Sequence, residues 1–127
     1  MITGSSGGIG SSLCKIFLKM ECKVIFTSSN DNKLNELKNK FGNENSYYLL
    51  NLSDTNSLPS AISKITEENT DIDILINNAG ISRDNLFLRM NADQWNEVIN
   101  VNLNSNFYII KSILPNMIKN KKGNIIG

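Results

Sequence analysis

The chain has 127 residues, of which 40% are hydrophobic and 20% charged, and its formal net charge is +1 at pH 7. These values fit one ordinary globular domain and argue against a general nucleic-acid binder, and no apolar run reaches the about 18 residues of a membrane span. There is no histidine, and Cys14 and Cys22 are the only cysteines, so we expect two buried, reduced thiols and no metal site.

A glycine-rich turn begins the chain, in the run Thr3-Gly4-Ser5-Ser6-Gly7-Gly8-Ile9-Gly10. Glycines let a backbone turn tightly and approach a phosphate, and a following helix points its free N–H groups at that anion. The run is therefore typical of a dinucleotide pyrophosphate site, and the alternative is a generic glycine turn. Only Met1 and Ile2 precede it, so we expect the first strand to be cut short. No signal-peptide pattern follows Met1, and we expect a cytoplasmic protein.

Apolar runs then alternate with segments of helical periodicity. Strands are expected at residues 23–27, 47–50 and 72–76, with the start of another at 124–126. Four helices are expected, each with one apolar face. The first has Ile9, Leu13, Ile16, Phe17 and Met20 on that face, and the second has Leu34, Leu37 and Phe41 and is capped by Asn30 or Asp31. The third has Leu58, Ala61, Ile62 and Ile65, is capped by Asp54 or Thr55 and carries Pro59 in its first turn, while the fourth, over residues 102–122, has Phe107, Ile110, Leu114 and Met117 and is bent or interrupted by Pro115.

This alternation predicts an α/β fold, a doubly wound parallel sheet with helices on both faces. We expect residues 1–127 to form a single, partial dinucleotide-binding domain that is truncated at both ends. In such a sheet a ligand binds at the carboxyl ends of the strands. The glycine-rich turn and two further motifs are expected to meet there.

The two further motifs are Asn51-Leu52-Ser53-Asp54 and Asn77-Asn78-Ala79-Gly80, and each follows an expected strand. Adjacent amides after a buried strand are costly unless their polar atoms are paired, which makes the second motif the more specific one. The alternatives are structural. Ser53 or Asp54 would only cap a helix, and the asparagines would only hold the sheet.

The spacing Thr-Gly-x-x-x-Gly-x-Gly, followed by a helix and a Val-Ile-Phe strand, resembles the short-chain dehydrogenase/reductase family, whose fold is Rossmann-like. The resemblance covers residues 2–126 and implies contacts to a nicotinamide dinucleotide. The implied cofactor-binding residues are Gly4, Ser5, Ser6, Gly7, Gly8, Ile9 and Gly10 at the pyrophosphate and ribose, Asn51 and Leu52 at the adenine, and Asn78, Ala79 and Gly80 near the nicotinamide ribose. Val101 is also implied to bind the cofactor.

Residues 81–90 narrow the resemblance, because they are similar to the corresponding stretch of bacterial 3-oxoacyl-acyl-carrier-protein reductases. Trp95, expected in the core, and residues 98–103 continue the pattern. Asn102 matches the family's catalytic asparagine, which holds a water in a proton relay; the alternative is a helix amide bonded to backbone.

The resemblance implies NADPH-dependent reduction of 3-oxoacyl groups on acyl carrier protein, in fatty acid biosynthesis, by an enzyme that is a homotetramer at full length. The alternatives are another short-chain reductase, acting on acetoacetyl-CoA or a hydroxysteroid, and a non-catalytic nucleotide-binding half-domain. Three lysines lie at the end of the last expected helix, Lys119, Lys121 and Lys122. They either interact favourably with the helix dipole and with solvent or bind the acidic carrier protein.

Cofactor choice depends on the residues after the second strand. NAD-specific members carry an acidic residue there that holds the ribose 2′-hydroxyl, whereas this chain has Thr27-Ser28-Ser29-Asn30. We therefore expect NADP(H), with Ser29 as the donor to the 2′-phosphate. Gly7 stands where NADP-preferring relatives often have a basic residue, and Lys33 can substitute only if it folds back.

The family's reaction needs a serine, a tyrosine and a nearby lysine. The resemblance places all three beyond residue 127, and Tyr47, Tyr48 and Tyr108 do not match the pattern. We therefore expect the 127-residue chain not to turn over, and to expose apolar surface that favours aggregation or marginal folding.

Overall fold

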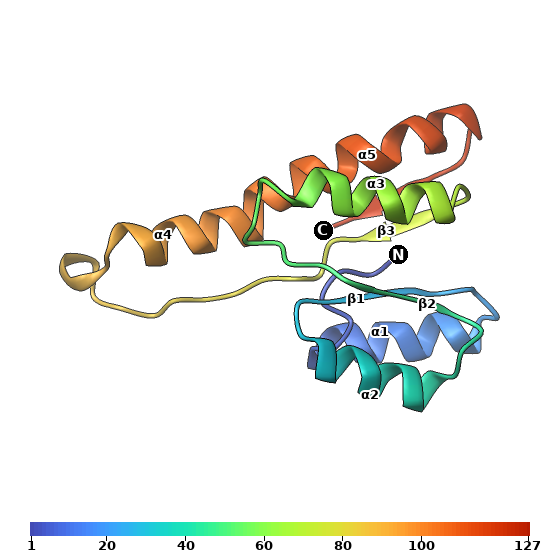
Figure 1. The fold of residues 1–127 in the computed structure, drawn as a ribbon, viewed down its shortest axis with the longest axis horizontal. Helices are drawn as coiled ribbons and strands as arrows, with labels where there is room; N and C mark the ends of the chain where they lie inside the picture. The colour runs from blue at the N-terminus through green and yellow to red at the C-terminus, as the bar shows by residue number, and fades with distance from the viewer.

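A parallel sheet with helices on both faces forms the centre of the computed structural model, which describes residues 1–127 (Figure 1). In chain order the elements are α1 (Gly8–Lys19), β1 (Ile25–Ser28), α2 (Asp31–Phe41), β2 (Ser46–Leu49), α3 (Leu58–Glu68), β3 (Ile74–Ile76), the 3-10 helix η1 (Phe87–Arg89), α4 (Ala92–Ile99), the π-helical turn η2 (Asn100–Asn104), α5 (Ser105–Lys119) and β4 (Asn124–Ile126). The predicted fold class is confirmed.

A single residue, Ile2, joins two pairs of strands into one sheet. β1 pairs with β2, and β3 pairs with β4, both in parallel. Ile2 forms parallel bridges to Phe26 of β1 and to Ile76 of β3, so the order across the sheet is β2, β1, Ile2, β3, β4. Successive strands are therefore added on both sides of Ile2, with β1 and β2 on one side and β3 and β4 on the other. The carboxyl side of that point is where doubly wound sheets bind ligands.

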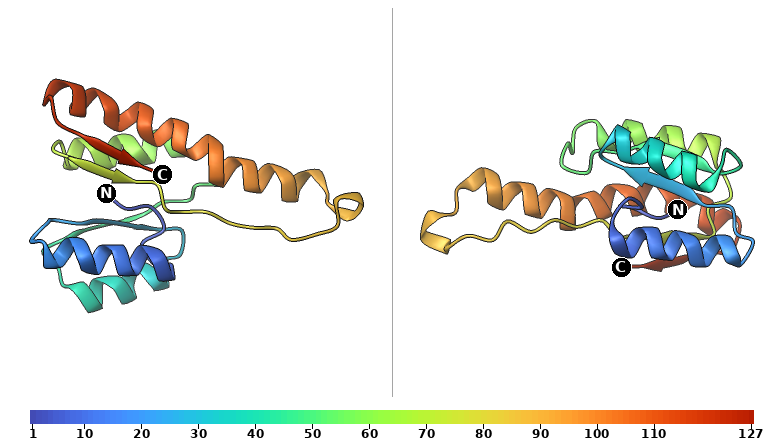
Figure 2. Two further views of the ribbon diagram at one scale, coloured as in Figure 1. Left: turned by 180° about the vertical axis from the view of Figure 1, so that it is seen from behind. Right: turned by 90° about the horizontal axis from the view of Figure 1, so that it is seen from below.

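Two helices cover each face of the sheet (Figure 2). On one face, Cys14 of α1 and Leu37 of α2 are buried against Phe26, whose ring also stacks on Tyr47 with the ring centroids 4.8 Å apart. On the other face, residues of α3 and α5 pack around Leu75 of β3. Burial of these apolar side chains is the main favourable term that holds the layers together.

The apolar faces predicted for two helices are wrong in part. Ile9 of α1 is 74% exposed, and Ile16 and Met20 are also exposed, while Gly10 and Cys14 are the buried residues of this helix. Leu13 and Phe17, also predicted on this face, pack partly buried beside Cys14, and Gly10 lets the helix come close to the turn before it.

The second partly wrong face belongs to α5. Met117 is buried and Ile110 packs against the core, as predicted, but Ile109 and Ile113 are also buried and Phe107 is 59% exposed. The helix predicted over residues 102–122 is observed as the end of η2 followed by α5, which ends at Lys119, and α4 directly precedes η2.

Smaller predictions also had mixed outcomes. Asn30 caps α2, as predicted, because its side chain accepts a hydrogen bond from the Lys33 N–H. Ser57, and not Asp54 or Thr55, precedes α3. Cys22 is half-buried and not buried.

A projecting arm consists of α4 and the segment that precedes it, residues 81–91, and extends beyond the sheet (Figures 1 and 2). Two contacts fasten the segment to the helix. The Arg83 guanidinium donates to both carboxylate oxygens of Glu97, each at 2.8 Å, and Asn91 forms a capping box with Gln94 at the start of α4. Trp95 is 52% exposed on this arm, so its predicted place in the core is wrong. None of the helices has the length and apolar character that crossing a membrane requires.

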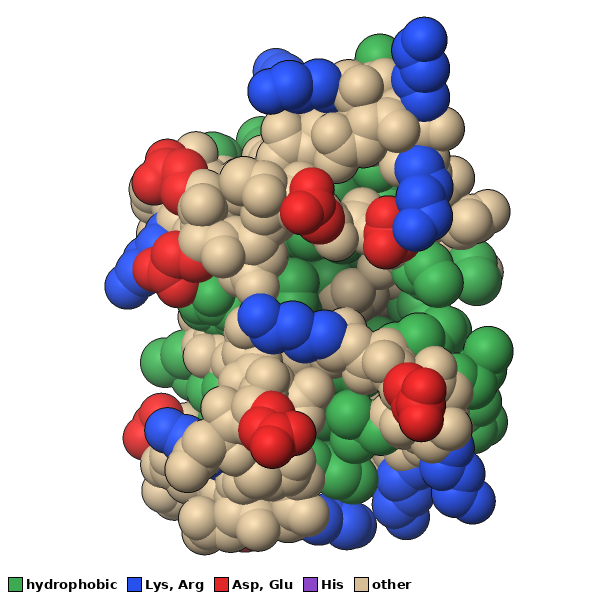
Figure 3. Space-filling model, turned by 90° about the vertical axis from the view of Figure 1, so that its right-hand side faces the viewer, with side chains coloured by type: hydrophobic (Ala, Val, Ile, Leu, Met, Phe, Trp, Pro, Cys, Tyr) green, Lys and Arg blue, Asp and Glu red, His purple; other side chains and the backbone are tan.

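The edge of the sheet at the amino ends of the strands has a different character. A cavity of about 330 Å³ opens there, with a mostly hydrophobic lining that includes Phe17, Val24 and Ile72. Figure 3 looks onto this edge and shows hydrophobic side chains in a hollow between charged ones. The polar motifs lie at the opposite edge.

Candidate functional site

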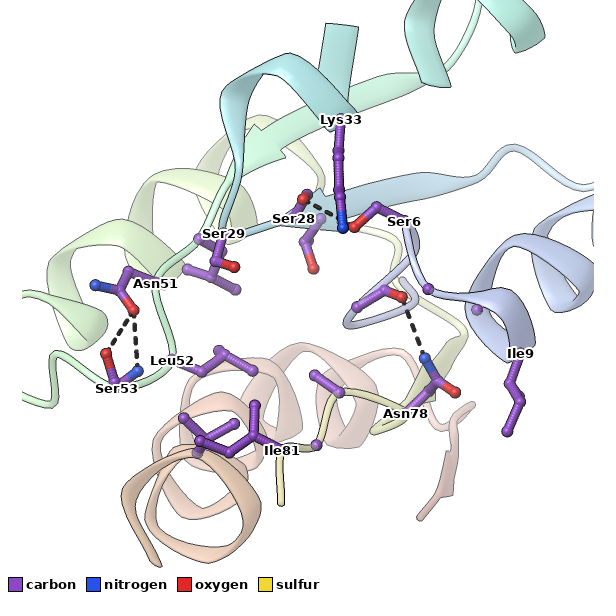
Figure 4. Close-up of a pocket in the computed structure, with 18 of the residues that line it drawn as sticks. Ser6, Ile9, Ser28, Ser29, Lys33, Asn51, Leu52, Ser53, Asn78 and Ile81 are labelled. Atoms are coloured by element: carbon purple, nitrogen blue, oxygen red, sulfur yellow. Dashed lines mark hydrogen bonds between the residues drawn. The ribbon is translucent and has the colours of Figure 1, made fainter. Parts of the chain in front are cut away.

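A cavity of about 430 Å³ opens at the carboxyl ends of the strands, where the predicted motifs meet (Figure 4). Its lining comes from the glycine-rich turn, the end of β1, residues 50–53 after β2 and residues 78–81 after β3. Lys33 of α2, Glu97 of α4 and Val101 of η2 complete it. Every predicted cofactor-binding residue except Ser5 lines this cavity. These predicted lining residues are Gly4, Ser6, Gly7, Gly8, Ile9, Gly10, Ser29, Asn51, Leu52, Asn78, Ala79, Gly80 and Val101.

Hydrogen bonds join the glycine-rich turn to the segment after β3. Thr3 Oγ1 accepts from the backbone N–H groups of Asn78 and Ala79, both at 3.0 Å. In return, Asn78 Nδ2 donates to the carbonyl oxygens of Thr3 at 2.9 Å and Gly4 at 3.3 Å. The Asn78 amide is thus paired, as its half-buried position requires. Asn77 uses its N–H on Ile126 O at 2.8 Å, while its buried Oδ1 has no partner.

Two glycines are required by this close approach. Gly4 has a φ of +64°, and a β-carbon there would lie 3.0 Å from the α-carbon of Ala79. A β-carbon on Gly10 would lie 2.3 Å from Gly4 O and 2.8 Å from Asn78 Nδ2. In contrast, a β-carbon on Gly8 meets no atom within 4 Å, so the cavity is open at that position.

The amino end of α1 faces the cavity. Gly7 at the N-cap offers no side-chain acceptor, and the first turn carries no acidic residue. The N–H groups of Gly8, Ile9 and Gly10 have no partner inside the helix, as at any helix start. They lie in the lining with the positive end of the helix dipole, an arrangement that suits an anion.

Ser5 takes a structural place beneath the turn. Its side chain is fully buried, donates to Ile2 O at 2.7 Å and accepts from the Thr27 N–H at 3.1 Å. The hydroxyl therefore ties the turn to the sheet and does not face the cavity.

The segment after β2 leaves one amide group available. Asn51 Oδ1 accepts from the backbone N–H and the hydroxyl of Ser53, at 3.1 Å and 2.8 Å (Figure 4). The Asn51 NH₂ group has no partner among these bonds. Leu52 is buried and offers an apolar side to the cavity. The pair can bind a flat heterocycle through one polar and one apolar contact.

Asn102, the predicted catalytic residue, lies in η2 and does not line the cavity. Its Oδ1 accepts from the Ile81 N–H at 2.9 Å and its Nδ2 donates to Ile81 O at 3.0 Å. The amide thus fastens the segment after β3 to the π turn, which is the alternative considered from the sequence.

The sequence-based assignment missed two side chains of α5 that donate to backbone carbonyl oxygens of η2. Ser105 Oγ donates to Val101 O at 2.7 Å, and Asn106 Nδ2 donates to Asn102 O at 2.9 Å. These bonds satisfy carbonyls in a turn whose backbone hydrogen bonds are irregular. The run of polar residues on an otherwise apolar helix was the available signal.

The tyrosines lie outside the cavity. None of the three tyrosines lines the cavity; Tyr47 donates to Gly42 O, and Tyr48 donates to Glu68. Burial raises the pKa of both phenols. Lys122 pairs with Asp73 at 3.1 Å.

The whole chain matches one family of known sequences. The family profile described as short chain dehydrogenase matches residues 1–127. The chain is 37% identical over 126 residues to the 3-oxoacyl-acyl-carrier-protein reductase FabG of Escherichia coli K12, covering 99% of this chain and 52% of that protein. It is 38% identical over 125 residues to FabG of Buchnera aphidicola, covering 98% of this chain and 51% of that protein. The chain thus spans about half the length of these curated relatives.

Solved structures agree on the fold. A metagenomic short-chain oxidoreductase in complex with NADP has a TM-score of 0.88 at 25% identity, covering 98% of this chain and 58% of that one. A short-chain dehydrogenase from Streptomyces avermitilis has a TM-score of 0.87 at 18% identity, covering 98% of this chain and 46% of that one.

Proposed function

The chain belongs to the short-chain dehydrogenase family, and from this premise we propose that it binds a nicotinamide dinucleotide in the cavity at the carboxyl ends of the strands. The single observation that carries this proposal is that three motifs far apart in the sequence line one cavity, with the amino end of α1 among them. A helix start without acidic residues favours a pyrophosphate, and the open position at Gly8 lets a ligand come close to the backbone.

The lining residues divide according to the parts of the cofactor. We assign the pyrophosphate and its ribose to Gly7, Gly8, Ile9 and Gly10 with Ser6, the adenine to Asn51 and Leu52, and the nicotinamide ribose to Asn78, Ala79, Gly80 and Val101. The free NH₂ group of Asn51 is a donor for a ring nitrogen. Ser5 supports the turn from below in this assignment and makes no contact with the cofactor.

When bound, such a cofactor supplies a hydride to a carbonyl carbon, and this chain's residues bind and orient it. For Asn102 we propose the family's role of holding a water in a proton relay. An amide group has two N–H bonds and two acceptor lone pairs, and the bonds to Ile81 use one of each. The remaining N–H and lone pair support this role.

For the whole protein we propose NADPH-dependent reduction of 3-oxoacyl groups on acyl carrier protein. The support is the 34–38% identity to FabG proteins across this chain. An acetoacetyl-CoA or hydroxysteroid reductase of the same family is the second candidate. NADPH oxidation by the protein that contains this chain, with acetoacetyl-carrier protein against acetoacetyl-CoA, separates them. Preference for the carrier-bound substrate supports the first, and preference for the CoA ester supports the second.

We also propose that the projecting arm is an assembly surface, and that the protein is a homotetramer. The surface continues from the arm into η2 and α5, since Trp95 of the arm, Leu103 of η2 and Phe107 of α5 are all more than half exposed. Large exposed apolar side chains that lie together mark interaction surfaces. Light scattering after size exclusion tests this proposal, and a monomer at high protein concentration would contradict it.

A further inference from the structure

We propose, on the basis of the dinucleotide function above, that Lys33 forms a second anion subsite with Ser6, Ser28 and Ser29. This subsite takes the 2′-phosphate of NADP(H), and Lys33 is the residue that selects NADP(H) over NAD(H). Figure 4 shows its side chain running from α2 across the end of β1, with the ammonium group toward Ser6.

The charges in the cavity lead to Lys33. Only Lys33 and Glu97 among the lining residues carry a charge. Both carboxylate oxygens of Glu97 accept hydrogen bonds from Arg83 at 2.8 Å. The protein's two salt bridges are this pair and Lys122–Asp73, so Lys33 has no carboxylate partner. The one uncompensated charge in the lining is therefore positive.

The position of Lys33 on its helix has no evident structural reason. Lys33 lies in the first turn of α2, where the Asn30 side chain accepts from its N–H at 3.0 Å. A cation near a helix amino end opposes the helix dipole, which favours acidic residues there. Side chains of a helix also lean toward its amino end, which brings this lysine back over the cavity. A bound anion beside Lys33 offsets this unfavourable interaction with the helix dipole, although Asp31 in the same turn also suits the dipole.

Hydroxyl groups complete the subsite. Ser6 Oγ and Ser28 Oγ lie 3.0 Å apart, and Ser28 Oγ also accepts a hydrogen bond from the Asn30 N–H at 3.2 Å. Ser29 lines the same cavity and is exposed. Hydroxyl donors beside an ammonium group suit a phosphate monoester. Asp31 does not line the cavity, and its carboxylate accepts from Asn35 Nδ2 at 3.3 Å.

The cavity therefore holds two anion positions. The amino end of α1 is one, and the Lys33 corner is the other, with Ser6 of the glycine-rich turn at the boundary between them. A ligand that fills both carries two separate phosphate groups, as NADP(H) does and NAD(H) does not. The glycine-rich turn itself has no basic residue, so in this chain the cation comes from α2.

Calorimetric titration measures the affinity of the chain for 2′,5′-ADP and for 5′-AMP, which differ only in the 2′-phosphate. The same comparison is then made with NADP⁺ and NAD⁺. In Lys33→Met, affinity for 2′,5′-ADP should fall about 10- to 100-fold while affinity for AMP stays the same, because a hydrogen bond to a charged group is lost. Lys33→Arg should retain the preference. Lys38→Met is the matched control, since Lys38 is in the last turn of α2 and outside the cavity.

An unchanged 2′,5′-ADP affinity in Lys33→Met would overturn this inference, as would an equal loss for both nucleotides. If the unmodified chain binds AMP and NAD⁺ without preferring the 2′-phosphate, the subsite is refuted and the dinucleotide function stands. If no nucleotide binds the folded chain, both are refuted.

Discussion

Replacing Gly10 by alanine should destabilise the protein, whereas the same replacement at Gly8 should not. The added β-carbon at position 10 would lie 2.3 Å from Gly4 O and 2.8 Å from Asn78 Nδ2. Overpacking of this kind costs about 1–3 kcal/mol. Moving the Asn78 amide away from its acceptors costs about 1 kcal/mol more. Alanine recovers about 1 kcal/mol through its better helix propensity, which leaves a net loss of about 1–3 kcal/mol.

Gly8 is the matched control, because it lies in the same helix turn and its added β-carbon meets no atom within 4 Å. Only the gain of about 1 kcal/mol from helix propensity applies there. Urea unfolding followed by far-UV circular dichroism should therefore place the Gly10→Ala midpoint about 1 M or more below that of Gly8→Ala. Equal midpoints would refute the packing of the glycine-rich turn against the segment after β3.

Four further predictions test the site and its surroundings. Thr3→Val should lose about 2–4 kcal/mol in urea unfolding, because two backbone N–H groups lose their acceptor, and Thr3→Ser should lose less; equal losses would contradict this. Asn102→Ala should lose about 1–2 kcal/mol and speed amide exchange after β3, since two hydrogen bonds disappear. Iodoacetamide should modify Cys22 in the native protein but Cys14 only on unfolding, because Cys14 is buried and burial raises the pKa of its thiol. Peptide mass spectrometry measures the modification rate of each cysteine, and equal rates in the native protein would contradict the burial of Cys14. Hydrogen bonds hold the pKa of the Asp54 carboxyl below its usual range, so the ionised group stabilises the fold at neutral pH and loses this effect as the pH falls below about 4. The difference in unfolding free energy between wild type and Asp54→Ala should therefore be smaller at pH 3 than at pH 7. A difference that stays constant with pH would contradict the lowered pKa.

The sequence predicted the fold class and the meeting of the motifs for the same reason. Each motif directly follows an apolar run, and the carboxyl ends of parallel strands share one edge of a sheet. The convergence therefore follows once the strands are recognised, without any knowledge of contacts. The Asn30 cap followed equally from a local rule, since its side chain bonds only to its own helix.

Orientation about a helix axis was harder to predict, because it depends on partners and not on periodicity alone. α1 turns its small residues to the sheet because Gly10 packs against Gly4 and Asn78, which the sequence separates widely. In α5 the predicted and the observed faces are both apolar, because Ile109 and Ile113 directly precede the predicted Ile110 and Leu114. A period of 3.6 residues therefore does not decide which of the two faces turns toward the sheet.

Titration of the ¹⁵N-labelled chain with NADP⁺, followed by amide chemical shifts, tests most directly that the three motifs bind one dinucleotide. Shifts should concentrate at Gly8–Gly10, at the Asn51 side chain and at residues 79–80, all at the same ligand concentration. Shifts confined to one of these segments, or none in a folded chain, would contradict the shared site.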